Sequence, residues 1–265
     1  MRKIAVVTGA SSGIGAATAR ALGDAGFHVV CAARRADRLF EVASACGGTA
    51  VVCDVDVDDD VSALAAAAGD RVDILVNCAG GAFDAAPVAS ADLDVWARMY
   101  SVNVLGLVRV TQALLPALRA SGNALVINIG STAGRAAYEG GGGYTAAKHG
   151  TKVITETLRL ELIEEPIRFC EIAPGMVATE EFALVRFAGD QARRDAVYVD
   201  VDEPLVAEDI AEAVRWLTTL PRHVSVDEMV IRPKAQAAQH KLYRGRIWQR
   251  PPADGGVDAQ ARSGT

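Results

Sequence analysis

The sequence places a tyrosine and a lysine four residues apart, directly after a run of glycines. The stretch EGGGGYTAAKHG, residues 139–150, contains Tyr144 and Lys148. Residues i and i+4 share one helix face, so a helix over residues 144–164 projects the two side chains together. A tyrosine is protonated at neutral pH, and a neighbouring ammonium group favours the phenolate and lowers the tyrosine pKa. The pair is therefore predicted to exchange a proton with an alcohol or carbonyl oxygen near physiological pH.

The glycine run itself predicts a loop. Residues 140–143 are four consecutive glycines, and glycine is poor in helices and costly to order. We expect a mobile loop with an unusual backbone path that leaves space for a substrate at the mouth of the site. The run either widens the pocket or is simply tolerated by the fold.

Short apolar runs alternate with longer helical segments along the chain, which is typical of a parallel sheet covered by helices on both faces. The expected strands are residues 3–8, 28–33, 49–55, 72–77, 124–130, 167–173 and 228–232. The expected helices are about 14–25, 36–45, 58–69, 91–119, 144–164 and 207–219. The 265 residues fit one large domain better than two small ones. The predicted fold class is α/β, with a doubly wound, seven-stranded parallel sheet.

A glycine-rich turn follows the first expected strand. In KIAVVTGASSGIGAATARAL, Gly9, Gly13 and Gly15 lie between that strand and an alanine-rich helix. Glycines allow a tight turn and let a pyrophosphate approach the backbone, while the helix N-terminus offers free N–H groups and a positive dipole end. The context predicts a dinucleotide-binding turn, and a plain tight turn is the alternative.

The residues at the end of the second expected strand indicate whether NAD(H) or NADP(H) binds. An acid at this position hydrogen-bonds the ribose hydroxyls, whereas an arginine accepts a 2′-phosphate. The sequence CAARRADR puts Ala33 in the place of the acid, and Arg34 and Arg35 follow with no carboxylate in the way. Asp37 suits capping of the next helix better than ribose binding. The pattern favours NADP(H) over NAD(H), and a solvated turn is the alternative reading of the two arginines.

The segment TGASSGIG resembles the fingerprint of the short-chain dehydrogenase/reductase family, whose members are single-domain Rossmann enzymes, and the resemblance continues to about residue 236. It implies that NCAG after the fourth strand steadies the sheet and passes the adenosine, that Asp54 and Val55 face the adenine, and that APGMVAT meets the nicotinamide. The implied cofactor-binding residues are Gly9, Ser11, Ser12, Gly13, Ile14, Gly15, Arg34, Arg35, Asp54, Val55, Asn77, Ala79, Gly80, Tyr144, Lys148, Pro174, Gly175, Val177 and Thr179.

The same resemblance assigns catalytic roles. Tyr144 and Lys148 resemble the YxxxK of the family, in which the tyrosine is the general acid/base and the lysine holds the nicotinamide ribose. Ser131 in NIGSTAG lies thirteen residues before Tyr144, as the family serine does, ready to hydrogen-bond the substrate oxygen. Asn103 in YSVNVLG resembles the helix asparagine that anchors a water beside the lysine. The alternative is that these four polar residues are unrelated and have no catalytic role.

The resemblance implies a catalytic domain over residues 1–236. Residues 178–205, approximately, fit the strand–helix pattern poorly and are expected to form a substrate lid. The extension over 237–265 loses periodicity and is expected to be partly disordered. Lid residues Phe182, Leu184, Val185 and Phe187 are expected to cover an apolar substrate. Arg186 either receives a carboxylate or is a solvated lid residue. The extension is basic and aromatic, and it is either a binding arm or packs on a neighbouring subunit of a homodimer or homotetramer.

Composition argues against several other classes. A formal charge of −6 disfavours nucleic acid or an anionic membrane as the partner. The apolar run in MRKIAVVTG is too short for a signal peptide or a spanning helix, so a cytoplasmic protein is expected. Five irregularly spaced cysteines predict buried reduced thiols, and four histidines without ligand spacing give no support for a metal site.

These features predict an NADP(H)-dependent oxidoreductase that interconverts an alcohol and a carbonyl on a small or medium organic molecule. The segment VSVDEMVIRPKAQ is similar to family members that oxidise serine and other 3-hydroxy acids. A 3-ketoacyl reductase acting on a carrier-bound chain is a second hypothesis. A dinucleotide-binding sensor without turnover is a third, and the presence of a proton donor disfavours it.

Overall fold

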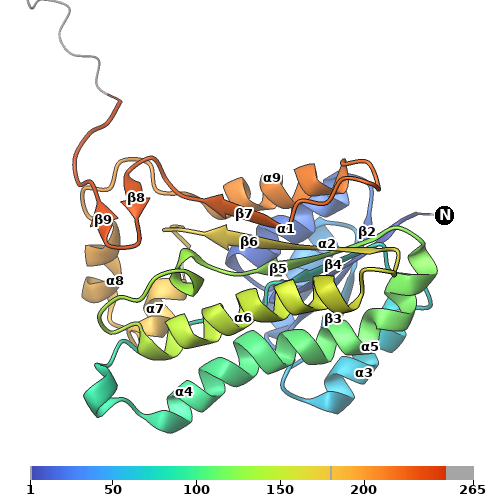
Figure 1. Ribbon diagram of the computed structural model, residues 1–265, viewed down its shortest axis with the longest axis horizontal. Helices are drawn as coiled ribbons and strands as arrows, with labels where there is room; N and C mark the ends of the chain where they lie inside the picture. Colours follow the sequence, from blue (N-terminus) through green and yellow to red (C-terminus); the bar gives the residue numbers. More distant parts are fainter. Residues whose placement is uncertain (1, 180, 249–265) are drawn as a thin grey trace, which may run out of the picture.

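The computed structural model describes residues 2–179 and 181–248, which form a parallel sheet between two layers of helices (Figure 1). The sheet has the order β3-β2-β1-β4-β5-β6-β7, and the predicted α/β fold is confirmed. The strands are β1 (Ile4–Thr8), β2 (His28–Ala33), β3 (Thr49–Val52), β4 (Ile74–Asn77), β5 (Ala124–Ile129), β6 (Ile167–Pro174) and β7 (Glu228–Ile231). The longer helices are α1 (Gly13–Asp24), α2 (Ala36–Ala45), α3 (Asp58–Ala68), α4 (Leu93–Tyr100), α5 (Gly106–Ser121), α6 (Gly142–Glu161) and α9 (Ala207–Thr218).

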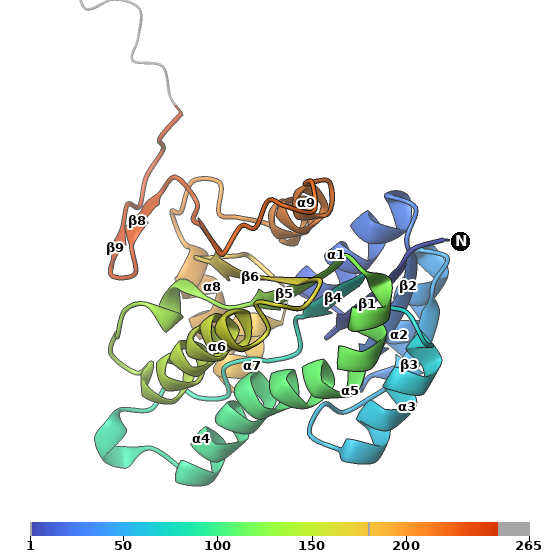
Figure 2. The same cartoon turned by 45° about the vertical axis from the view of Figure 1, so that its right-hand side comes forward.

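Two separate hydrophobic cores lie on the two faces of the sheet. Side chains of α1, α2 and α9 fill one core, and side chains of α3, α5 and α6 fill the other. Figure 2 shows α9 and α1 across the sheet from α5 and α6. Strands such as β5, which is buried along its whole length, therefore read as continuous apolar runs because both of their faces are covered.

The strand order reverses between β1 and β4, since β2 and β3 lie on one side of β1 and β4 to β7 on the other. Loops that leave the carboxyl ends of these two strands diverge to opposite faces of the sheet. Such a switch point opens a crevice at that end of the sheet, where ligands of doubly wound proteins bind.

A single long helical stretch runs through α4, the five-residue π-helix η2 (Ser101–Leu105) and α5. Asp92 caps it, because its carboxylate accepts hydrogen bonds from the backbone of Asp94 and Val95. The stretch Leu93–Ser121 is long and apolar enough to cross a membrane by length and composition alone. It packs against α3 and α6, and its apolar window is 56% buried in the fold, so it serves as a core helix.

The glycine run begins a helix as well as forming a loop. Helix α6 begins at Gly142, so the expected loop over residues 140–143 is wrong in its second half. A Cβ on Gly142 would lie 2.7 Å from the Trp96 ring, and one on Gly143 would lie 2.6 Å from Met99 Cε. Glycine is therefore needed where α6 packs closely on α4, and this tertiary contact outweighs the poor helix propensity of glycine.

The segment expected to be a lid contains two short helices, α7 (Phe182–Arg186) and α8 (Gln191–Tyr198). A hairpin of β8 (Gln236–Ala238) and β9 (Lys241–Leu242) follows the sheet and lies at the same end of the molecule (Figure 1). The expected domain boundary after residue 236 thus falls inside β8. The expected disorder of the last dozen residues lies outside the described part of the chain.

Candidate active site

A cavity of about 610 Å³ lies at the carboxyl ends of the strands and reaches from the glycine turn to Tyr144. Most of the predicted site residues line it: Gly9, Ser11, Ser12, Gly13, Ile14, Gly15, Arg34, Arg35, Asp54, Val55, Ala79, Gly80, Ser131, Tyr144, Lys148, Pro174, Gly175, Val177 and Thr179. Among the described residues, the predicted Asn77 and Asn103 are not on the cavity wall. The fold therefore gathers segments from most of the chain around one space.

Two glycines of the turn lie so close to neighbouring backbone atoms that a larger residue would not fit. Gly9 has φ +67°, and a Cβ there would lie 2.9 Å from the Ala79 backbone nitrogen. A Cβ on Gly15 would lie 2.2 Å from the Gly9 carbonyl oxygen. Helix α1 begins at Gly13, and Ser12 gives it no side-chain cap among the described residues. The first N–H groups of α1 thus remain available to an anion in the cavity.

Arg35 connects the second strand to the glycine turn. Its guanidinium donates to the hydroxyls of Ser11 at 3.0 Å and Ser12 at 2.8 Å. The expectation that no carboxylate stands beside the arginines is wrong, because Glu181 accepts a hydrogen bond from Arg35 at 2.5 Å. Arg34 points elsewhere and lies 3.7 Å from the Asp54 carboxylate.

Asn77 stabilises the sheet from behind the cavity. Its amide donates to Thr111 Oγ1 at 3.0 Å and to Asn128 Oδ1 at 2.9 Å. Asn128 in turn donates to Thr155 Oγ1 at 2.8 Å. This buried network joins β4 and β5 to α5 and α6, which agrees with the expected steadying role.

Tyr144 and Lys148 both lie on the first turns of α6 and are 7% and 6% exposed. The Lys148 Nζ atom is 5.8 Å from the centroid of the Tyr144 ring and donates to the Ile129 carbonyl oxygen at 2.8 Å. Ser131 follows β5 and accepts a hydrogen bond from the Ala133 backbone at 3.1 Å. The phenol, the ammonium group and the hydroxyl therefore line the same part of the cavity.

Burial dominates the electrostatics of this pair. Burial raises the pKa of Tyr144, and the nearby Ser131 hydroxyl only partly offsets this effect. The lowering of the Tyr144 pKa expected from Lys148 is therefore not found. Burial also lowers the pKa of Lys148 to about 8, because a desolvated ammonium group is disfavoured. Burial thus shifts both groups toward their neutral forms, but a lysine with a pKa of about 8 is still mostly protonated at pH 7.

Asn103 lies within η2, where its side chain is held by backbone groups. Its amide donates to the carbonyl oxygens of Gly81 at 2.9 Å and Met99 at 2.8 Å. A Cβ on Gly80 would lie 2.4 Å from Asn103 Oδ1 and 3.8 Å from Lys148 Nζ, so the asparagine and the lysine are close neighbours across that glycine.

The lid covers the phenol with aromatic and basic side chains. The Phe182 ring meets the Tyr144 ring edge-on, with centroids 5.6 Å apart. The Arg186 guanidinium lies 5.2 Å from the Tyr138 ring centroid and 5.6 Å from that of Phe187. Arg186 also lines the cavity, which favours the expectation of a ligand-facing role over that of a solvated lid residue.

Comparison with known proteins identifies the family. The profile described as short chain dehydrogenase matches residues 3–186, which is more than half of the chain. The chain belongs to the short-chain dehydrogenase family. Its relatives in this family support an oxidoreductase that acts on CH–OH substrates.

Three relatives place the chain within the short-chain dehydrogenase family. It is 55% identical to an uncharacterized oxidoreductase of Mycobacterium tuberculosis, over 89% of this chain and 93% of the relative. It is 41% identical to sulfoacetaldehyde reductase 2 of Chromohalobacter salexigens, over 89% of this chain and 96% of the relative. The closed form of a serine dehydrogenase complexed with NADP⁺ matches with a TM-score of 0.84 and 34% identity, covering 94% of this chain and all of that one.

Several residues of this short-chain dehydrogenase site had no signal in the sequence. Gln236 and Gln239, from the β8–β9 hairpin, line the cavity. Gln236 accepts a hydrogen bond from the Met176 backbone at 2.8 Å, and Gln239 accepts one from Thr132 Oγ1 at 2.6 Å. The hairpin lies far along the chain from the segments that it contacts, so no local pattern could indicate it.

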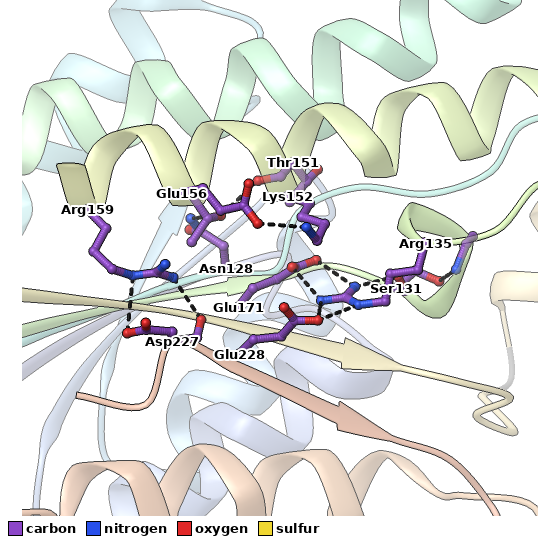
Figure 3. A network of polar contacts seen from close by, with 12 residues as sticks. Asn128, Ser131, Arg135, Thr151, Lys152, Glu156, Arg159, Glu171, Asp227 and Glu228 are labelled. Carbon is purple, nitrogen blue, oxygen red and sulfur yellow. Dashed lines mark hydrogen bonds and ion pairs between the residues drawn. The ribbon is translucent and has the colours of Figure 1, made fainter. Parts of the chain in front are cut away.

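The loop that carries Ser131 is positioned by a buried ion pair (Figure 3). Glu171 on β6 is 2% exposed and lies 2.8 Å from Arg135, which also pairs with Glu228. Arg135 donates to the Ser131 carbonyl oxygen at 3.1 Å. A Cβ on Gly130 would overlap the Glu171 carboxylate, at 1.8 Å. The acid inside β6 thus connects the sheet to the backbone of Ser131.

Proposed function

We propose that this protein is an NADP(H)-dependent oxidoreductase that interconverts an alcohol and an aldehyde or ketone on a small organic substrate. The observation that carries the proposal is the placement of Tyr144 and Lys148, buried together on the wall of the cavity that also contains the glycine turn. A sensor that only binds a dinucleotide has no need of a phenol and an ammonium group at the end where a substrate would react.

The residues of the cavity fit a dinucleotide. Gly9, Gly13 and Gly15 leave the turn without side chains, so a pyrophosphate can come close to its backbone. The N-terminus of α1 offers N–H groups to that pyrophosphate. Arg35 with Ser11 and Ser12 already holds an anion, the Glu181 carboxylate. These donors support NADP(H), as does the similarity to the NADP⁺ complex of a serine dehydrogenase. Thr179 lies across the turn from Gly13 and lines the same cavity, so it would be among the residues that hold the cofactor.

In the proposed mechanism the bound nicotinamide supplies or accepts the hydride. Tyr144 donates its phenolic proton to the carbonyl oxygen of the substrate during reduction and removes the hydroxyl proton during oxidation. The Ser131 hydroxyl hydrogen-bonds the same oxygen and holds it near the phenol. Lys148, whose pKa is about 8, can return a proton to the phenolate near physiological pH. Asn103, held beside Lys148, is placed to orient a water that supplies it.

We propose that the substrate carries an acidic group. Sulfoacetaldehyde and serine, named for two of the relatives, each have an anionic group one carbon away from the carbon that reacts. Arg186 lines the cavity, and its guanidinium donates to the Gly140 carbonyl oxygen at 3.3 Å. Its guanidinium, held between Tyr138 and Phe187, is suited to bind a carboxylate or sulfonate bidentately. The 3-ketoacyl reductase hypothesis has less support, because a lid arginine close to the phenol disfavours a long acyl chain there.

The function is tested by Tyr144→Phe. This variant removes the exchangeable proton and keeps the ring, so turnover of NADPH with aldehydes should fall by about 10³-fold. The affinity for NADPH, measured by fluorescence titration, should change by less than about twofold. A variant as active as the wild type would refute the assignment of Tyr144.

The substrate class is tested with a panel of aldehydes and ketones of matched size, with and without a carboxylate or sulfonate. Anionic members should have kcat/KM values at least about tenfold above their neutral counterparts, because a charged hydrogen bond in the cavity stabilises them selectively. Equal values for the two groups would contradict the proposed role of Arg186 while leaving that of Tyr144 intact.

We further propose a cytoplasmic homodimer or homotetramer. Support comes from apolar side chains that are exposed on the long helices and on β7: Val153, Leu160, Leu105, Tyr100 and Val230. Such patches on an otherwise soluble fold mark contacts between subunits.

A further inference from the structure

The lid places an acid on the arginines that follow the second strand. Glu181 directly precedes α7, and its carboxylate accepts hydrogen bonds from Ser12 Oγ at 2.9 Å and from Arg35 at 2.5 Å. It also pairs with Arg38. Ser11 joins the group through its own hydrogen bond from Arg35. We call Ser11, Ser12, Arg35 and Arg38 the serine–arginine cradle.

The cradle holds one anion. Its donors come from the turn after β1 and from the end of β2 through the first turn of α2, the place where a doubly wound protein receives the 2′-phosphate of NADP(H). Carboxylates and phosphates use the same guanidinium and hydroxyl donors. A carboxylate and a phosphate in the same cradle would repel each other at short range, so occupation by one disfavours the other.

We propose that Glu181 is a specificity-determining residue for the cofactor, acting as an internal competitor for the 2′-phosphate. The inference rests on the NADP(H) preference proposed above. Binding of the phosphate must displace the carboxylate, and the apparent affinity for NADP(H) is reduced by the fraction of molecules whose cradle is already filled. NAD(H) has a free 2′-hydroxyl and carries no such cost.

The competition also links the adenosine end of the cavity to the lid. Glu181 is followed by Phe182, whose ring covers the phenol of Tyr144. While the carboxylate is in the cradle, the residue directly before α7 is attached to Ser12 and Arg35. Displacement of Glu181 by a 2′-phosphate releases this attachment, so the phosphate acts on the segment that covers the site of reaction.

The expected effect is moderate, because the contacts are partly solvated. The Glu181 side chain is 22% exposed, but Arg35 and Arg38 are 46% and 51% exposed. Arg35 nonetheless holds the pKa of Glu181 below its usual value, so the carboxylate is charged at neutral pH. A partly exposed charged contact of this kind changes an equilibrium by about fivefold.

The first test is isothermal titration calorimetry of the full chain with NADP⁺ and with NAD⁺. Glu181→Gln removes the charge and keeps the size, and it should lower the Kd for NADP⁺ by about fivefold while the Kd for NAD⁺ stays within about twofold. Asp195→Asn is the matched control, since Asp195 lies in the same lid but pairs with Arg194. It makes the same change in net charge and should alter neither Kd.

The outcomes separate this inference from the proposed function. A Kd for NADP⁺ that is unchanged or weaker in Glu181→Gln would overturn the role of Glu181 alone. Wild-type protein that binds NAD⁺ and not NADP⁺ would refute the cofactor preference itself, and the inference with it.

The second test reads the lid directly by hydrogen–deuterium exchange. The probes are 2′,5′-ADP and 5′-AMP, which differ by the phosphate and lack the nicotinamide half. In the wild type, 2′,5′-ADP should increase amide exchange over residues 182–198, and 5′-AMP should not. In Glu181→Gln, exchange over this segment should be raised without any ligand. Equal exchange with the two probes in the wild type would overturn the link between the cradle and the lid.

Discussion

The ionisable groups of the site are controlled by burial more than by each other. The Lys148 ammonium group lies near the Tyr144 ring, yet desolvation raises the pKa of the phenol and lowers that of the lysine. A buried pair of this kind can respond strongly to a ligand, because a charge that arrives there meets less solvent screening than at the surface. The structure thus corrects the expectation, drawn from spacing alone, that the lysine by itself makes the phenol acidic.

The buried lysine should lower the stability of the protein at neutral pH. The pKa of Lys148 is lowered from 10.5 to about 8 on folding, so the unfolded chain binds the proton more readily between these values. The free energy of unfolding contributed by this group therefore rises with pH across that window. Lys148→Met should raise the stability at pH 7 by about 2 kcal/mol, allowing for the lost hydrogen bond to Ile129, and should abolish turnover.

The measurement is urea unfolding of wild type and Lys148→Met at pH 7 and pH 9.5. The stability difference between the two proteins should shrink as the pH rises, and groups common to both cancel in that difference. A difference that is independent of pH would contradict a lowered pKa for Lys148.

At the scale of elements, α6 packs closely on α4 and on the loop before α4. Gly140 has φ +66°, and a Cβ there would lie 2.7 Å from the carbonyl oxygen of Ala85. Gly142 and Gly143 pack on the side chains of α4, as described above. Each glycine from 140 to 143 thus meets a neighbour where a side chain would not fit, which explains a run that local helix propensity alone disfavours.

Gly140→Ala tests this packing. It should lower the stability by about 2–4 kcal/mol, because the left-handed backbone and the overlap with the Ala85 carbonyl both oppose a side chain. Gly47→Ala is the control, since Gly47 has φ +61° and nothing within 4 Å of a Cβ. It should cost only about 1 kcal/mol. Equal losses in thermal unfolding would show that the approach to Ala85 is unimportant.

At the scale of the whole molecule, the strand order decides where chemistry can occur. Because β1 and β4 are neighbours and their following loops diverge, the turn after β1 and the loop after β4 border one crevice. The lid and the β8–β9 hairpin close the same end of the sheet (Figure 1). Away from the cavity, the C-terminal end of α6 carries the exposed side chain of Leu160, which suits contact with another subunit.

We expect Leu160→Glu to weaken the proposed assembly. Leu160 is 76% exposed on α6, and a charge placed inside an apolar subunit contact would be desolvated without a partner. Light scattering after size-exclusion chromatography should show a smaller species with an unchanged circular dichroism spectrum. Phe40→Glu, on α2 and 57% exposed, is the control and should keep the assembly intact. Persistence of the full assembly in Leu160→Glu would exclude this face of α6 as the contact.

The sequence by itself was enough to predict features that depend only on residues close to one another along the chain. Periodicity predicted all seven strands of the sheet and the longer helices, since apolar runs and helical spacing reflect local burial. Glycine spacing between a strand and a helix predicted the turn, and the i, i+4 rule predicted that Tyr144 and Lys148 lie together. These inferences need only a few residues at a time.

Only the tertiary structure decided which distant groups meet. Glu181 and Arg35 are 146 residues apart in sequence, so no pattern could show that an acid fills the place expected for a phosphate. Asn77 lies directly before the cavity loop, yet its side chain points to Thr111 and Asn128. Gln239 reaches the cavity because the β8–β9 hairpin lies at the same end of the sheet, where Thr132 donates to it. Such contacts are set by the packing of whole elements, and the burial that shifts the pKa of Tyr144 is a property of that packing as well.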